Sequence, residues 1–438
     1  MGSKPSKIRR STPAKTKTVI AGPTIPQDIV NEIVDHLAID SNFRSIRTCA
    51  LLSKSWVQPC RRHLFRTVAF TTRGVSRWFK TFPVPGGSPA HHVKDLRIWI
   101  GGGGCVSEEF FKHTPWFTNA ERISLLGHEG VPPLRKTALW RLPQSVTSLT
   151  IDPSVVTLVQ VRDIMAQLPN LDNLSLLGYP AAVDMRRLPG IGTVLRGRFG
   201  GRLILSDGYA REDYINMLLE IPSGLRFAEV EVHCTREHHL SVIWLAEACA
   251  RTLVKLSHTV TSNCESYPSS QIPILTPFPE VDGWETFDQF FNFSKFPNLQ
   301  EVNFGFRVSW KNGGLPWIPR ALSTLRPATF PRLSSLRLDL FGPSHDQSVE
   351  TLIEWTGSDL LRIADEVCRI DREFEGAVNF TVVPDSKFKV VLNALDVTCC
   401  FAMLTRPRGC VYLPPFAPCR SSSATAIVEA GSTVNPRR

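Results

Sequence analysis

Short apolar clusters of one form recur along most of this chain. The form is apolar-x-x-apolar-x-apolar, which directs two side chains of a short strand to the same side. The middle residues of seven consecutive copies are Leu96, Ile123, Leu149, Leu174, Leu203, Val230 and Leu256. They are separated by 27, 26, 25, 29, 27 and 26 residues. Two later copies, centred on Val302 and Leu336, follow after 46 and 34 residues, so insertions are expected in the second half.

Helical patterns lie between these clusters. The clearest cover residues 155–168, 211–221, 238–253, 316–325 and 348–374. One strand and one helix every 25–29 residues is typical of leucine-rich-repeat solenoids, whose units pack only on their neighbours. The asparagine that usually follows the strand is missing, so we expect irregular repeats. The prediction is an α/β solenoid, and an ordinary α/β domain with strands at similar spacing is the alternative.

Composition divides the chain into four parts. Residues 1–22 contain six Lys or Arg and almost no apolar side chains, so they are expected to be disordered. The proline- and serine-rich residues 413–438 are expected to behave in the same way. A helical domain over residues 23–70 and the repeat region over residues 71–412 lie between these tails.

The net charge of +10 comes mostly from the first tail. Of the 50 Lys and Arg residues, six lie in residues 1–22, which leaves 44 against the 40 Asp and Glu. This balance argues against a nucleic-acid-binding face, which is normally basic. No apolar run is long enough to cross a bilayer and no secretory signal is present, so we expect a cytoplasmic or nuclear protein. The 11 cysteines are then expected to be reduced.

Residues 23–70 carry the pattern of three short helices. In the first, apolar residues recur at helical spacing and form one stripe, made by Ile29, Val30, Ile33, Val34 and Leu37. A second helix is expected over residues 43–52. A third comes next, with Trp56, Cys60 and Leu64 on one side. So small a core is marginal alone, and the unit is expected to rest on another part of the protein.

The order of residues in this segment resembles the F-box. That family opens with a Leu-Pro dipeptide, continues with apolar residues at helical spacing and closes with a Val-Ser-Lys-x-Trp-like element. This chain has Ile25-Pro26 at the first place and Leu52-Ser53-Lys54-Ser55-Trp56 at the last. The basic stretch at residues 61–66 is similar to the segment after the tryptophan in many fungal members. The resemblance covers about 45 of the 438 residues.

The resemblance implies a function. F-box proteins dock through this helical unit onto the Skp-type adaptor of an SCF (cullin-RING) ubiquitin ligase, and the domain behind the F-box selects a protein substrate. Such docking packs helices around an apolar centre, so apolar residues are the candidate adaptor-binding anchors. They are Ile25, Pro26, Ile29, Ile33, Leu37, Leu51, Leu52 and Trp56. Some of them must instead fill the core of the unit, and the sequence does not apportion them.

Two other interpretations of this segment stay open. In the first, the helices only close the open end of the repeat array, which every such array requires. The protein would then be a repeat scaffold that binds other proteins and has no role in ubiquitin transfer. The second is a helix-turn-helix DNA reader using Arg61, Arg62 and Arg66, which is disfavoured because the other helices carry acids as often as bases.

The residues between the inward-facing positions of the repeat strands are expected on the concave face of the sheet. This register places polar, charged and aromatic side chains there, as a specific protein partner requires. The candidate substrate-binding residues are Arg97, Trp99, Asn173, Glu229, Glu231, Asn303, Arg337 and Asp339. A merely solvated sheet face has the same mixture, so the pattern indicates no particular substrate.

No enzyme, cofactor or metal motif is found in the sequence. The glycine run at residues 101–104 lacks the Lys-Ser/Thr pair of a phosphate-binding P-loop. His238 and His239 do not form H-E-x-x-H, and no Cys/His set has zinc spacing. We therefore expect a binding subunit without an active site of its own. Its expected partners are the adaptor with its cullin complex and a protein substrate.

The first residues fit one further pattern. Met1-Gly2-Ser3-Lys4-Pro5-Ser6 matches the motif for N-myristoylation at Gly2. A myristoyl chain together with the basic residues after it would supply the two signals that stable membrane attachment requires. The same basic run is equally typical of a nuclear import signal or a solvated tail. Membrane contact is expected only if Gly2 is lipidated.

Overall fold

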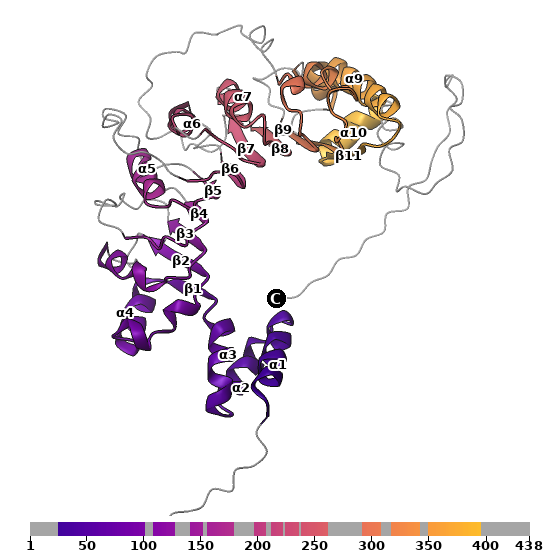
Figure 1. Ribbon diagram of the computed structural model, residues 1–438. Helices are drawn as coiled ribbons and strands as arrows, with labels where there is room; N and C mark the ends of the chain where they lie inside the picture. The colour runs from indigo at the N-terminus through magenta and orange to yellow at the C-terminus, as the bar shows by residue number, and fades with distance from the viewer. Residues whose placement is uncertain are drawn as a thin grey trace, which may run out of the picture.

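The computed structural model describes residues 25–100, 108–127, 141–151, 156–178, 197–206, 212–221, 224–235, 238–261, 291–307, 317–341 and 349–395. They form a mixed α/β protein, in which a small unit of helices precedes a long, curved parallel sheet with helices on its outer side (Figure 1). Gly2, the two tails and the glycine run at residues 101–104 lie outside the described residues.

The described strands form one eleven-stranded sheet in which spatial order follows chain order and every pairing is parallel. They are β1 (Thr67–Phe70), β2 (Asp95–Ile100), β3 (Arg122–Gly127), β4 (Ser148–Ile151), β5 (Asn173–Leu176), β6 (Arg202–Leu205), β7 (Glu229–Thr235), β8 (Lys255–Thr261), β9 (Glu301–Arg307), β10 (Ser335–Phe341) and β11 (Asn379–Pro384). Each strand therefore adds to the edge left by the one before it.

The middle residues of the predicted clusters align in one row across the sheet. In register order the row is Val68, Leu96, Ile123, Leu149, Leu174, Leu203, Val230, Leu256, Val302, Leu336 and Phe380. From Leu96 onward every member is buried and belongs to one continuous apolar core. The strands predicted from the spacing are confirmed, and β1 and β11 extend the row at its two ends.

A repeated backbone contact joins most of the strands to the next. The carbonyl of the residue before or at the start of one strand accepts the N–H groups of two consecutive residues at the start of the following strand. Lys94 N and Asp95 N, for example, both donate to Arg66 O, at 2.8 and 3.0 Å. The other carbonyls used in this way are those of Lys94, Glu121, Thr147, Gly201, Ala228, Val254 and Gln300. The recurrence shows that successive units have the same geometry where their strands begin.

An asparagine precedes three of the strands and ties each unit to the one before it. Asn170 Nδ2 donates to Gln144 O at 2.9 Å, and Asn298 Nδ2 donates to Arg251 O at 2.7 Å. Asn119 makes the equivalent bond to the carbonyl of residue 91. The side-chain amides thus satisfy loop carbonyls that no strand partner reaches.

The helices cover the apolar side of the sheet. They are α4 (Thr72–Thr81), α5 (Leu158–Ala166), α6 (Glu212–Leu219), α7 (His239–Ala248), α8 (Trp317–Ser323), α9 (Val349–Glu373) and α10 (Ser386–Ala394), with short 3₁₀ turns η1 (Pro85–Gly87), η2 (Pro89–His92), η3 (Glu108–Lys112), η4 (Thr114–Trp116) and η9 (Phe293–Lys295). The five helices predicted from the sequence are confirmed as α5 to α9. In Figure 1 the strands line the inner side of the bend and α4 to α7 lie outside it.

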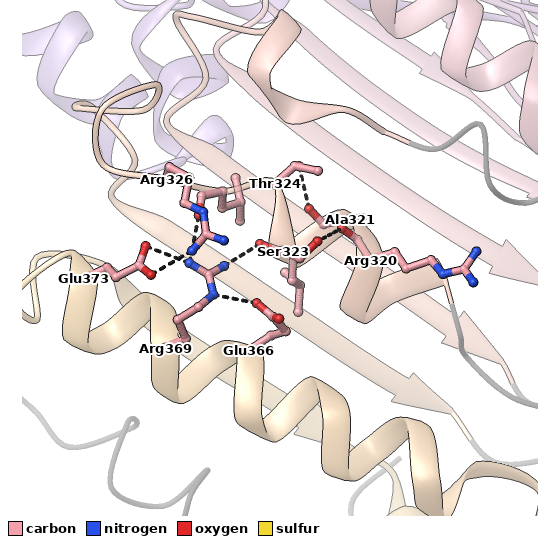
Figure 2. A network of polar contacts seen from close by, with 10 residues as sticks. Arg320, Ala321, Ser323, Thr324, Arg326, Glu366, Arg369 and Glu373 are labelled. Atoms are coloured by element: carbon pink, nitrogen blue, oxygen red, sulfur yellow. Dashed lines mark hydrogen bonds and ion pairs between the residues drawn. The ribbon is translucent and has the colours of Figure 1, made fainter.

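One arginine holds α9 to the end of α8 (Figure 2). Arg369 Nη2 donates to Leu322 O at 2.9 Å, and Nη1 donates to Leu325 O at 3.2 Å. Carbonyls at the C-terminal end of a helix lack their intrahelical N–H partners, so the guanidinium satisfies groups that the fold would leave bare. Glu366 and Glu373, on the same face of α9, each hold the guanidinium at 2.7 Å.

The N-terminal unit consists of α1 (Gln27–Ile39), α2 (Phe43–Cys49) and α3 (Lys54–Leu64). Its core is small and separate from that of the sheet, and it is built from Val30, Val34, Ile46, Trp56 and Cys60. Pro59 lies inside α3 and has no N–H for Ser55 O, the carbonyl four residues earlier. Gln27 Nε2 of α1 donates to that carbonyl at 3.1 Å, so the proline's missing bond is used to join α1 to α3.

The helical unit joins the sheet directly. Only Phe65 and Arg66 separate the end of α3 from the first strand. The Phe65 ring packs edge-on against Trp78 of α4 with 5.8 Å between ring centroids, inside the aromatic cluster below β1. His92 Nε2 of η2 lies 3.2 Å from Gln58 Oε1 of α3 and adds a polar contact. The helical unit therefore packs against α4 and η2, which follow β1 in the chain.

Candidate protein-binding surfaces

Apolar side chains are exposed on one side of the helical unit. Ile29 and Ile33 project from α1, and Ile25 precedes that helix. Leu51 and Leu52, which are 85% and 63% exposed, occupy the turn between α2 and α3. Clustered exposed aliphatic side chains of this size are typical of a surface that binds another protein.

The contact between α1 and α3 brings the first turn of α1 close to the turn that precedes α3. Gln27 lies between Ile25 and Ile29, and its bond to Ser55 O holds the first turn of α1 against the start of α3. Leu52 lies three residues before Ser55. We call the set Ile25, Pro26, Ile29, Ile33, Leu51 and Leu52 the apolar end of the helical unit; all six residues are exposed.

Two of the predicted adaptor-binding residues pack in or against the core of the helical unit and are not part of the apolar end. Trp56 is 8% exposed and belongs to the core of the helical unit, so its indole is not part of the apolar end. Leu37 is half-buried against the same core. Trp56 is thus one of the predicted anchors that fill the core of the unit, where it packs in one cluster with Val30 and Val34 of α1.

Sequence reasoning missed two exposed apolar residues at the opposite end of α1. Ile39 is the last residue of α1 and Phe43 the first of α2, and they are 77% and 47% exposed. The signal was available, since both lie beside the polar break at residues 40–42, where a helix end cannot cover them. Exposed apolar side chains therefore also occur at this other end of α1.

A charged cluster stabilises the contact between α1 and α3. Asp35 accepts from Arg62 Nη2 at 2.5 Å and lies 2.6 Å from His63 Nε2. Partial burial raises the pKa of Asp35, but the hydrogen bonds from Arg62 and His63 outweigh it and leave that pKa below its usual value. Two of the basic residues after Trp56, Arg62 and His63, thus join α3 to α1.

The polar side of the sheet carries all eight predicted substrate-binding residues. Register pairing places Arg97, Ser124, Thr150, Ser175, Ile204, Glu231, Ser257, Asn303 and Arg337 in one row across β2 to β10. Asn173 and Glu229 lie in the row before it, and Trp99 and Asp339 in the row after it. These rows alternate with the buried ones, as the two-residue period of a strand requires.

Charges on β6 to β9 are paired with one another. Arg202 Nη2 lies 2.5 Å from Glu231, and its Nε lies 3.7 Å from Glu229. Lys255 and Glu301 are 2.7 Å apart on the next two strands. Partial burial raises the pKa of Glu231, but hydrogen bonds from Arg202 and His233 outweigh it and lower that pKa. Glu229 and Glu231, predicted to bind substrate, therefore already have basic partners in the sheet.

An arginine and an aspartate two residues apart occur on two strands. On β2, Arg97 Nη2 donates to Asp95 at 3.1 Å, and on β10, Arg337 Nε donates to Asp339 at 2.8 Å. In each pair the aspartate is buried and the arginine is exposed. Asp339 is thus shielded by Arg337, and only the guanidinium is presented to a partner.

The described residues were also compared with the requirements of a metal site. Among the described residues, no three His, Cys, Asp or Glu side chains are arranged to hold a metal ion. Cys234 Sγ lies 3.2 Å from His258 Nε2, but both side chains are buried beneath the sheet. Within the same part of the chain, no helix is both long and apolar enough to cross a membrane.

The sequence was compared with protein-family models and with curated proteins. No protein-family model matches the sequence, and the comparison with curated proteins gives no match either.

Proposed function

We propose that this protein is the substrate-recognition subunit of an SCF-type ubiquitin ligase. In this proposal the helical unit is an F-box that docks onto a Skp-type adaptor, and the curved sheet is an irregular leucine-rich-repeat solenoid that binds a protein substrate. The chain itself performs no ubiquitin chemistry; it holds the substrate near partner subunits that do, which raises the effective concentration of the reacting groups.

The observation that carries the proposal is the apolar end of the helical unit. Five aliphatic side chains of this small unit are exposed to water. Burial of each would stabilise the protein by about 1.5–3 kcal/mol, so their exposure forgoes a stabilisation that the small core does not replace. Their exposure together is accounted for if a partner covers them. The segment's resemblance to the F-box names that partner as a Skp-type adaptor.

The arrangement of the two units supports the second half of the proposal. The direct connection between α3 and β1, with the Phe65 and His92 contacts, holds the sheet in one orientation relative to the helices. In this proposal one partner binds the apolar end and another binds the polar side of the sheet. A receptor that positions its cargo relative to an adaptor requires such a rigid joint.

Capture of a purified Skp-type adaptor by the full chain tests the proposal. The variant Ile29→Glu/Leu52→Glu places charges on the apolar end without touching the core. We expect capture to fall about hundredfold or more, because two central aliphatic contacts are lost and two carboxylates are buried in their place. The matched control is Leu240→Glu/Trp244→Glu, which changes two exposed apolar residues of α7, and it should bind as the wild type does.

Two results would favour a repeat scaffold without a ubiquitin role. One is that the wild-type chain captures no adaptor; the other is that the Ile29/Leu52 variant captures as much as the control. Loss of capture in Trp56→Ala is not informative by itself, because removal of this core side chain destabilises the unit by about 3–5 kcal/mol.

A further inference from the structure

The polar side of the sheet is not uniform along its length. On β7 to β10 it carries Glu229, Glu231, Glu301 and Asp339, and every one of these carboxylates has a basic partner. On β2 to β5 the only carboxylate among the described residues of this face is Asp95, and it is buried. The two halves therefore present different chemistry to a partner.

Two arginines dominate the half formed by β2 to β5. The Arg97 side chain is 52% exposed while that of its partner Asp95 is 8% exposed, so the guanidinium faces solvent. Arg122, the register neighbour of Asp95 on β3, is exposed and makes no ion pair within the described part of the chain. A guanidinium offers several hydrogen-bond donors in a planar fork, which suits a carboxylate.

Hydroxyl groups and an apolar strip lie next to these arginines. Ser124, Thr150 and Ser175 continue the row of Arg97 across β3 to β5, and all three are half-buried. Trp99 and Leu126 are register neighbours at the other end of β2 and β3, and both are half-buried. We call the set Arg97, Trp99, Arg122, Leu126, Thr150 and Ser175 the β2–β5 patch.

The dimensions of the patch suit a short extended peptide. Four strands at about 4.8 Å spacing span about 14 Å, and the four residue steps from Arg122 to Leu126 span about 13 Å. An extended chain advances about 3.3–3.6 Å per residue. A carboxylate over the arginines and an apolar side chain over Trp99 and Leu126 would thus belong to residues two to four positions apart.

We propose that the β2–β5 patch binds an extended acidic segment of a partner protein, with an apolar side chain two to four residues from an acidic one. The arginines hold the carboxylate, the hydroxyls meet polar groups of the segment, and Trp99 with Leu126 receives the apolar side chain. Naming this segment as cargo for ubiquitin transfer rests on the proposed receptor function. The binding itself does not.

Selection from a phage-displayed library of random twelve-residue peptides tests the proposal. The library is panned against the full chain, and the most enriched peptide is synthesised with a fluorescein label for anisotropy titration. We expect enrichment of Asp and Glu with an apolar residue two to four positions away. Binding of the labelled peptide should weaken about tenfold or more in Arg97→Glu/Arg122→Glu, since attraction becomes repulsion at both sites.

The matched control is Arg226→Glu/Arg332→Glu, which makes the same change in net charge at exposed positions before β7 and β10. It should bind the peptide as the wild type does. Enrichment of basic peptides, no enrichment, or equal loss of affinity in the two double variants would overturn the proposal. Adaptor capture by the Arg97/Arg122 variant is measured in parallel, so that failure of the patch and failure of adaptor docking give different results.

Discussion

At the scale of single residues, burial sets the charge state of two histidines. His239 at the start of α7 is 1% exposed, and its ring centroid lies 4.8 Å from that of His258, which is fully buried. Burial lowers the pKa of His239 from 6.5 to about 3. Burial also lowers the pKa of His258 well below 6.5, and the neighbouring His239 and His233 contribute to this shift. Both rings are therefore neutral in the folded protein near neutral pH.

We expect the protein to lose stability as the pH falls below 6.5. The unfolded chain takes up a proton at His239 near pH 6.5, whereas the folded protein does so only near pH 3, so the added protons favour unfolding. Between pH 7.5 and 5 this residue alone should account for about 2 kcal/mol. Urea unfolding at the two pH values measures the effect, and His239→Gln should show a smaller pH dependence.

The control for this measurement is His36→Gln on α1. The His36 side chain is 73% exposed, so its replacement should leave the pH dependence of the wild type unchanged. A His239→Gln protein that loses as much stability as the wild type would contradict the argument, because the proton uptake would then come from other groups.

At the scale of elements, the side chain of Arg369 stabilises the contact between α8 and α9. Arg369 satisfies two carbonyls at the end of α8 and is itself held by two glutamates of α9. Arg326, which lies after α8, donates to Glu373 at 2.7 Å and continues the network. The hydrogen bond from Arg369, with that from Arg326, lowers the pKa of Glu373. The contact between α8 and α9 thus depends on a planar, multiply bonded group.

Replacement of Arg369 by methionine should destabilise the protein by about 2 kcal/mol, because the carbonyls of Leu322 and Leu325 lose a charged donor. Arg369→Lys should recover less than half of this, since an ammonium group cannot reach both carbonyls and both glutamates. Arg362→Met, at an exposed position on the same helix, is the control and should change stability by less than about 0.5 kcal/mol. Chemical denaturation measures all three. Equal losses in Arg369→Met and Arg362→Met would contradict the assigned role.

At the scale of the whole molecule, the buried row from Leu96 to Phe380 is the feature that joins the repeats. Each member of the row except Phe380 lies between the strands before and after its own, because strand order in the sheet follows chain order. On β6, Leu203 belongs to this row, and the next residue, Ile204, belongs to the polar side. The pair therefore tests which side of the sheet faces the core.

We expect Leu203→Ala to cost about 2–5 kcal/mol and Ile204→Ala less than about 1.5 kcal/mol. The first change leaves a cavity in a fully buried position, and the second removes a half-buried side chain from an open face. Urea denaturation of the two variants gives the comparison. A larger effect for Ile204 would mean that the register is shifted by one residue, because such a shift exchanges the two faces.

The strands were predictable because their signal is repeated. One apolar cluster predicts little, but clusters at Leu96, Ile123 and Leu149 with steps of 27 and 26 residues favour units of one length stacked in parallel. The hydrogen bonds from the asparagines that precede three of the strands were not predicted, because an asparagine was expected after the strand. It lies before the strand: Asn170 and Asn298 both directly precede the first apolar residue of a cluster.

Sequence alone predicted that the front of the chain is helical and that strands recur behind it, because side-chain periods of about 3.6 and 2 are local properties of the backbone. It did not determine which apolar column of α1 is core. Val30 and Val34 differ from Ile29 and Ile33 by one position, or about 100° around the helix. Only the packing of α3, through Trp56, selected the valines and left the isoleucines exposed. That choice depends on contacts between residues distant in the chain, so it appears only in the tertiary structure.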